Sequence, residues 1–176
     1  MRAERPDGAA ESVDFDSFFR EHFPGVARAA ALVARDLWVG QDLAQEAFVR
    51  LHPRWRDMES LDHARNFLYR VAINLARSQL RRQLRLRRLG LSGREETDSA
   101  PDPLARTLDW LQVSEALAEL SSRQRACVVL VDYVDMDPAA AGSILGIRPE
   151  TVRVHLLRGR RALKETLGRS RAEEEE

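Results

Sequence analysis

With 176 residues, the chain is long enough for one ordinary domain or two small ones, which excludes a large multidomain enzyme. Hydrophobic residues make up 44% of it and charged residues 32%, a balance that allows a buried core and excludes disorder throughout the chain. The 28 Lys and Arg residues equal the 28 Asp and Glu residues in number, and the single cysteine, Cys127, excludes an internal disulfide and a thiolate zinc site.

The chain begins with a polar segment, residues 1–12, which lacks the apolar stretch of a signal peptide and is expected to be disordered. Over residues 15–89, apolar side chains recur at helical spacing with no sustained alternation of period two, which predicts helices. Asp14 is placed to cap the first helix, and Pro24 is expected to bend or restart it. The longest weakly polar run, residues 26–34, is too short to span a bilayer, so we expect a soluble cytoplasmic protein without membrane insertion.

The third predicted helix carries a strong segregation of charge. Residues 65–94 contain nine arginines and no acidic residue, and arginine suits forked hydrogen bonds to phosphate. Phe67, Tyr69 and Asn74 lie within this block, where stacking and amide hydrogen bonds could hold single-stranded bases over a cationic groove. The alternative is an arginine-rich face that is merely solvated, with Phe67 in the core.

A change of composition divides the chain into two parts. Residues 90–107 are rich in Gly, Ser, Thr, Asp, Glu and Pro and poor in apolar residues, as expected of a flexible linker. The predicted fold is therefore all-α, with one small helical domain over residues 13–89 and a second over residues 108–168. We expect the two domains to be mechanically independent, and residues 169–176 to form a disordered acidic tail.

Two start signals predict helices in the second domain. Ser121 and Gln124 form a capping box, which predicts a helix over residues 122–134. Asp137 followed by Pro138 is an acidic cap with proline at the first helical position, and it predicts the next helix.

The most specific local pattern is a helix-turn-helix. This motif needs a small residue where its two helices touch, a glycine in the turn four residues later, and apolar residues on the inner side of the second helix. Gly142, Gly146, Val152 and Leu156 fill these places. An ordinary helical hairpin with a basic solvated face is the alternative. Candidates for contacts with base edges and phosphates are Glu150, Thr151, Arg153, Val154, His155 and Arg158.

Signals of an enzyme are weak. Asp132, Asp135 and Asp137 resemble a metal-binding cluster, although Asp137 is already explained as a helix cap. The histidines show no ligand spacing, and the chain has neither a phosphate-binding glycine loop nor a nucleophile elbow. Cys127 lies among apolar residues and is expected to be a buried structural thiol. We therefore expect no catalytic residue, no metal and no cofactor.

Four segments in this order resemble an extracytoplasmic-function (ECF) sigma factor of bacteria, a branch of the sigma-70 family. They are residues 42–51, 66–77 and 120–125 and the helix-turn-helix. The resemblance implies that the first domain is a sigma-two domain, which binds the beta-prime clamp helices of core RNA polymerase and opens the minus-ten promoter element. It implies that the second is a sigma-four domain, which reads the minus-thirty-five element and meets the beta-subunit flap.

The resemblance also assigns residues to partners by position. The residues that match the polymerase-binding helix are Asp42, Gln45, Glu46 and Arg50. The residues expected at promoter DNA in the first domain, double-stranded or melted, are Tyr69, Asn74, Arg77, Arg81 and Arg82. The loop over residues 56–64 corresponds to the one that receives a flipped base, but its sequence does not name the pocket. Where relatives commonly place a Ser cap, Arg148 precedes Pro149, and a phosphate contact by Arg148 is the expected replacement.

These observations favour a transcription initiation factor without catalytic chemistry of its own. An anti-sigma factor that holds it inactive is a further candidate partner. The first alternative is a stand-alone helix-turn-helix repressor or activator, which would need no polymerase-binding helix and would usually dimerise. The second alternative is a metal-dependent nucleic-acid enzyme that uses Asp132, Asp135 and Asp137.

Overall fold

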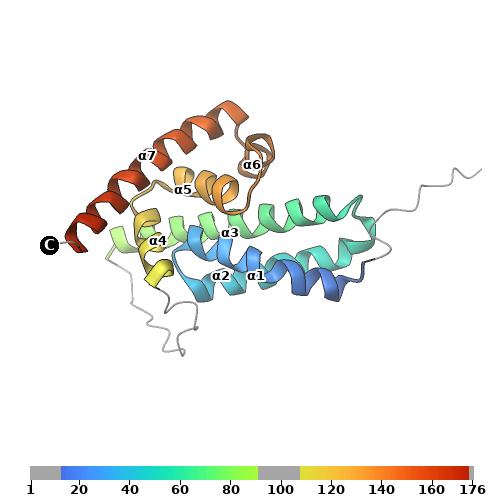
Figure 1. The fold of residues 1–176 in the computed structure, drawn as a ribbon. Coiled ribbons are helices and arrows are strands. Elements are labelled where there is room, and N and C mark those ends of the chain that lie inside the picture. Colours follow the sequence, from blue (N-terminus) through green and yellow to red (C-terminus); the bar gives the residue numbers. More distant parts are fainter. Residues whose placement is uncertain (1–12, 91–107, 175–176) are drawn as a thin grey trace, which may run out of the picture.

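The computed structural model describes residues 13–90 and 108–174, and every regular element in these ranges is helical (Figure 1). The elements are α1 (Phe15–Ala34), α2 (Leu37–Leu51), the 3-10 helix η2 (His52–Asp57), α3 (Leu61–Arg88), α4 (Leu108–Ala118), α5 (Ser122–Val128), the π-helical turn η4 (Val129–Tyr133), α6 (Pro138–Leu145) and α7 (Pro149–Glu174). The all-α prediction is confirmed. No helix in the described ranges is long and apolar enough to cross a membrane.

The first module, α1 to α3, is a bundle of three helices that pack along one another (Figure 1). Asp14 caps α1 as predicted, since its carboxylate accepts a hydrogen bond from the backbone N–H of Ser17 at 2.8 Å. Pro24 was expected to bend or restart this helix; the restart is wrong, because α1 continues through Pro24 to Ala34. The second half of α1 is almost entirely buried, and this packing offsets the one backbone hydrogen bond that a proline removes.

The second module, α4 to α7, starts its helices where the sequence predicts. Ser121 and Gln124 exchange the two hydrogen bonds of a capping box, at 3.3 and 3.0 Å, and Asp137 caps α6 through the backbone N–H of Ala139 at 2.7 Å. The helix predicted over residues 122–134 is α-helical only to Val128 and continues as the π-helical turn η4.

The predicted disordered tail needs a correction. The last helix, α7, runs through Glu174, so residues 169–174 are helical rather than disordered. Arg, Ala and Glu dominate these positions, and all three are good helix formers, which favours a longer helix. The predicted linker lies outside the described residues except for Gly90.

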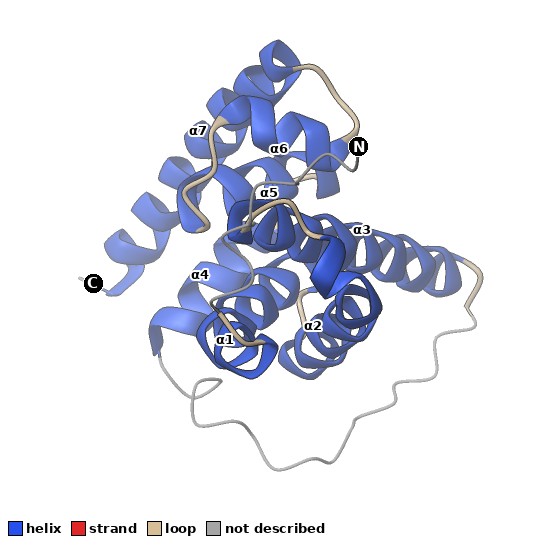
Figure 2. Cartoon of the chain, turned by 90° about the vertical axis from the view of Figure 1, so that its right-hand side faces the viewer, coloured by secondary structure: helices blue, strands red, loops and turns tan. Residues whose placement is uncertain are grey.

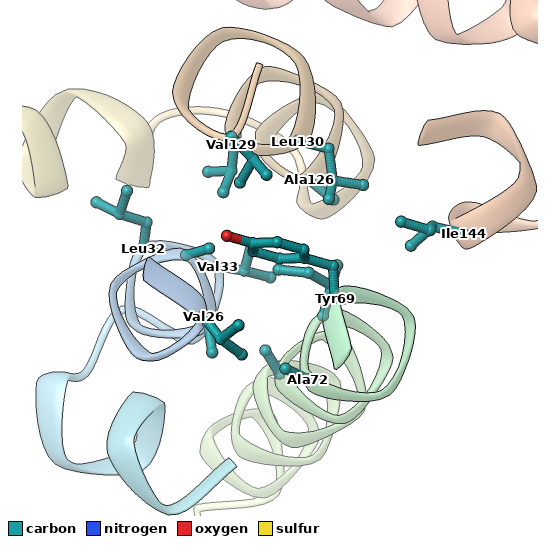
Figure 3. Close-up of a cluster of buried hydrophobic side chains, with 14 of the residues drawn as sticks. Val26, Leu32, Val33, Tyr69, Ala72, Ala126, Val129, Leu130 and Ile144 are labelled. Carbon is teal, nitrogen blue, oxygen red and sulfur yellow. The ribbon is translucent and has the colours of Figure 1, made fainter. Parts of the chain in front are cut away.

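The two modules are packed against each other, in contrast to the predicted mechanical independence. Here α5 and η4 lie on α1, and α6 lies on α3, so that the second module sits across the first (Figures 1 and 2). One continuous cluster of buried apolar side chains joins them. In Figure 3, Leu32, Val33 and Tyr69 of the first module face Val129 and Leu130 of the second.

Candidate polymerase and nucleic-acid interfaces

The α2 surface is formed by the four polar residues expected at polymerase: Asp42, Gln45, Glu46 and Arg50. Helix α2 begins after Asp36, whose carboxylate accepts a hydrogen bond from the backbone N–H of Val39 at 3.0 Å. Its inner side buries Ala44, Ala47 and Phe48 against the bundle. This packing leaves the α2 surface accessible to solvent, with the guanidinium Nε of Arg50 2.7 Å from a carboxylate oxygen of Glu46 one turn earlier.

An apolar residue that the sequence analysis missed completes the α2 surface. Val49 is 66% exposed and lies one helical turn after Gln45 and Glu46. A valine in water among charged and amide side chains is typical of a protein interface with a small apolar centre. Its position outside the apolar period of α2 was the signal that could have identified it.

The residues of α3 expected at promoter DNA divide into two groups. Arg81 and Arg82 are exposed. Asn74 is also exposed, but its Nδ2 donates a hydrogen bond to the backbone carbonyl of Ile144 in α6, at 3.3 Å. Arg77 is half-buried, and burial, together with the nearby charges of Arg81 and Arg123, lowers its pKa. Asn74 and Arg77 therefore lie on the side of α3 that is turned toward the second module, and Asn74 remains exposed to solvent there.

Tyr69 packs within the buried apolar cluster that joins the two modules. Its side chain is only 6% exposed, and burial raises the pKa of its phenol. The guanidinium carbon of Arg65 lies 5.6 Å from the centre of the ring, within the range of a cation–π contact. Figure 3 shows the ring between the helices of the two modules. Tyr69 cannot stack on a base unless the second module moves.

The predicted helix-turn-helix is present in α6 and α7. Gly146 ends α6 in the left-handed region at φ 67°, which favours glycine, and its N–H donates to the carbonyl of Gly142. A Cβ on Gly142 would lie 2.7 Å from the backbone oxygen of Ile147, so the turn leaves no room for a side chain there. Val152 and Leu156 are buried on the inner side of α7, as the motif requires.

The outer face of α7 presents most of the residues proposed to read DNA. Arg148, Glu150, Arg153, Val154 and Arg158 are exposed, whereas Thr151 and His155 are half-buried. Glu150 and Arg153 form an ion pair at 3.8 Å. Burial, followed by the charges of Arg123 and Arg158, lowers the pKa of His155, which favours the neutral imidazole.

One residue of this face was not predicted from the sequence. Leu157 is 73% exposed, next to Arg158 and one helical turn after Arg153 and Val154. An exposed leucine beside Val154 gives the outer face of α7 an apolar component, which suits contact with thymine methyl groups. The signal was again an apolar residue outside the period that Val152 and Leu156 define.

Two of the three aspartates proposed as a metal cluster make other contacts. Asp132 receives two hydrogen bonds from Arg160, one of them from Nε at 3.1 Å. Asp137 caps α6, and Asp135 lies between them with a positive φ of 61°. Within residues 13–90 and 108–174, no group of three His, Cys, Asp or Glu side chains is placed to hold a metal ion. Within these residues, the three aspartates are therefore not placed as one set of metal ligands.

Comparison with known proteins agrees with the two modules. The sigma-70 region 2 family matches residues 18–86, and the sigma-70 region 4 family matches residues 110–163. The chain is 32% identical over 167 residues to the ECF RNA polymerase sigma factor SigL of Mycobacterium tuberculosis, a match that covers 90% of this chain and 92% of SigL. It is 28% identical over 166 residues to SigE of Mycolicibacterium smegmatis and spans 63% of the length of that protein.

Among solved structures, the chain resembles the sigma factor RpoE of Bartonella quintana in its complex with the anti-sigma factor NepR. The TM-score is 0.72 at 22% sequence identity, over 88% of this chain and 97% of the other, which shows a shared fold. The two family matches follow the order of the two modules, and the likeness to SigL spans both of them. The chain belongs to the ECF sigma factors of the sigma-70 family and is a sigma factor that directs RNA polymerase.

Proposed function

We propose that the chain binds the beta-prime clamp helices of core RNA polymerase through the α2 surface and contacts a promoter with both modules. The first module, residues 13–89, would hold the melted minus-ten element, and the second, residues 108–168, the double-stranded minus-thirty-five element. The observation that carries this proposal is the occurrence of both surfaces on one chain: an exposed polar α2 surface around Val49, and a helix-turn-helix with an exposed cationic outer face. A stand-alone repressor or activator would have no use for the α2 surface.

In the second module, we propose that Arg153 and Arg158 supply affinity for duplex DNA. An arginine in the major groove can donate two hydrogen bonds to guanine, while Val154 can contact a thymine methyl group. Arg148, which precedes the first turn of α7, is suited to a backbone phosphate because helix N-termini attract anions. The exposure of these side chains supports the assignment.

In the first module, Arg81 and Arg82 are proposed to contact phosphates, since both are exposed and make no ion pair with a described residue. Asn74 and Tyr69 are proposed to contact unpaired bases, by amide hydrogen bonds and by stacking. Arg77 lies between the two pairs and is proposed to bind the backbone near the edge of the melted region.

An apolar groove in the second module is proposed as the site for the beta flap. It has a volume of about 230 Å³ and lies between α4, η4 and α7. Val113, Tyr133 and Leu167 are among its lining residues and are each more than one third exposed, although all three have large apolar groups. A groove of this kind fits the apolar face of a helix or a short segment. Leu32 of α1 closes one side of it in the present arrangement.

Three further parts of the proposal follow from this function. Polymerase supplies the chemistry of RNA synthesis, and this chain contributes binding and DNA melting without catalysis of its own. Its work takes place in the cytoplasm, where the polymerase and the promoters are. An anti-sigma factor is proposed as a partner, because the structurally similar RpoE forms a complex with the anti-sigma factor NepR.

A binding assay with core polymerase tests the proposal. The double substitution of Gln45→Ala and Glu46→Ala removes the central polar side chains of the α2 surface and leaves its buried side intact. We expect at least a tenfold loss of affinity for core enzyme at unchanged helicity. The matched control substitutes Arg20→Ala and Glu21→Ala, two exposed charged residues of α1, and should bind like the wild type. Equal affinity of both double variants would refute the assignment of the α2 surface.

A further inference from the structure

We propose that the junction of α3, α5 and α7 is a binding site for a small oligophosphate anion, such as inorganic pyrophosphate or the diphosphate of a nucleotide. The site is a cationic cluster formed by five residues: Arg77, Arg81, Arg123, His155 and Arg158. The inference goes beyond the proposed contacts with polymerase and promoter, in which Arg123 has no part. Arg123 is the residue of the cluster that is close to both neighbouring helices.

The close packing of α5 on α7 supplies one half of the site. An added Cβ on Gly159 of α7 would lie 3.7 Å from the Cβ of Gln124 in the first turn of α5, so the two helices are in contact there. Arg123 directly precedes Gln124, and His155 and Arg158 lie in the turn of α7 that precedes Gly159. Burial of the imidazole, followed by the charges of Arg123 and Arg158, lowers the pKa of His155.

Helix α3 supplies the other half of the site. Arg77 and Arg81 lie one helical turn apart, and α5 packs against α3. Arg77 is half-buried, and its burial, followed by the charges of Arg81 and Arg123, lowers the pKa of its guanidinium. The charge of Arg123 therefore acts on a residue of α3 and on a residue of α7.

Two buried nitrogen atoms of the cluster lack a hydrogen-bond partner. Within residues 13–90 and 108–174, the buried side-chain nitrogen and oxygen atoms without a partner are Arg77 Nε and His155 Nδ1. A buried polar atom is destabilising when it is left unpaired, and a guanidinium N–H can only donate. Both atoms belong to this one cluster, so the junction has hydrogen-bonding capacity that an acceptor-rich ligand would satisfy.

The cluster has no acidic partner in the part of the chain that the structure describes. The ion pairs there are made by other arginines, namely Arg50, Arg153, Arg160 and Arg161. Like charges that are held together repel one another, and a bound anion removes this repulsion. The guanidinium fork matches the oxygens of a phosphate group. Because the cations come from three helices, a diphosphate with two anionic groups can contact more of them than a single phosphate can.

Isothermal titration calorimetry of the full-length chain with sodium pyrophosphate tests this site. Arg123→Gln removes one charge of the cluster and touches no residue assigned to DNA or polymerase. Arg28→Gln, at an exposed arginine of α1, is the charge-matched control. We expect Arg123→Gln to bind pyrophosphate about fivefold more weakly than Arg28→Gln. Equal affinities of the two variants, or no binding by the wild type at an ionic strength matched with sodium chloride, would overturn the proposal.

The imidazole of His155 provides a second readout. A bound anion favours the charged form against the repulsion of Arg123 and Arg158, so saturating pyrophosphate should raise the pKa of His155. Proton NMR measures this pKa, and the spectrum of His155→Gln identifies the resonance. An unchanged pKa of His155 at saturation would show that the anion binds elsewhere, which would also overturn the proposal.

Titrations with two other probes separate the possible sources of the phosphate groups. Adenosine diphosphate should bind Arg123→Gln more weakly than Arg28→Gln if the site accepts a nucleotide. If only pyrophosphate distinguishes the two variants, the ligand is the free inorganic anion. A duplex oligonucleotide of mixed sequence is the third probe. If the duplex distinguishes the variants while pyrophosphate does not bind, these arginines serve the DNA backbone alone and the oligophosphate site is refuted.

Discussion

The buried Arg125 should contribute several kcal/mol to the stability of the folded chain. Its guanidinium donates four hydrogen bonds to backbone carbonyls, one in α1 and three at or just after the end of α4: those of Val33, Leu117, Ala118 and Leu120. Hydrogen bonds from a charged donor contribute about 1.5 kcal/mol each at the lower end of their range. Burial of the guanidinium also carries a desolvation penalty, which lowers the pKa of Arg125 to about 10. This penalty offsets roughly half of the total from the hydrogen bonds. We therefore expect Arg125→Met, which keeps the apolar stem, to lower the free energy of unfolding by about 3 kcal/mol.

Urea unfolding followed by circular dichroism measures this loss. Arg125→Lys keeps a charge but presents a single ammonium group, so it should fall between the wild type and Arg125→Met. Arg123→Met, at an exposed arginine two residues away, is the control and should change stability by less than about 0.5 kcal/mol. If Arg125→Met lowers the free energy of unfolding by less than about 1 kcal/mol, the four hydrogen bonds of Arg125 do not stabilise the fold as predicted.

Three other predictions concern the helix-turn-helix. Gly142→Val should lower the free energy of unfolding by about 2 kcal/mol or more in urea unfolding, because its Cβ would overlap the backbone oxygen of Ile147. Arg153→Ala should weaken binding to a matched duplex by about 1–3 kcal/mol in a fluorescence titration and relax selectivity at one base pair, whereas a uniform loss on all duplexes would indicate a phosphate contact. The pKa of His155 is lowered on folding, so the unfolded chain takes up this proton first, and stability is lost as the pH falls below 6.5. His155→Gln should reduce the loss of stability between pH 7 and pH 5, measured by urea unfolding at each pH. If the variant loses as much stability as the wild type, His155 is not the cause of the loss.

Local features of the fold could be predicted from the sequence because their causes lie within a few residues. The capping of α1 by Asp14, the capping box of Ser121 and Gln124, and the tight turn at Gly142 and Gly146 each involve groups at most a turn or two apart. The same short-range logic identified the inner and outer faces of α2 and α7, since helical period alone separates them.

The contact between the modules could not be predicted in this way. Arg125 and Val33 are 92 residues apart in sequence, and Asn74 and Ile144 are 70 apart. No periodicity relates such positions, and the composition of residues 90–107 suggested separation instead. Tyr69 illustrates the consequence, because an aromatic residue in a basic block is equally compatible with stacking on a base and with the buried position that it occupies.

The central claim, that this chain directs RNA polymerase to promoters, is tested most directly by run-off transcription. Core polymerase would be combined with the full-length chain on a library of genomic fragments, and the transcripts would be mapped. The account predicts discrete start sites that depend on the chain and that disappear with the Gln45→Ala and Glu46→Ala double variant. Chain-dependent initiation that this variant supports as well as the wild type, or no initiation despite binding to core enzyme, would contradict it.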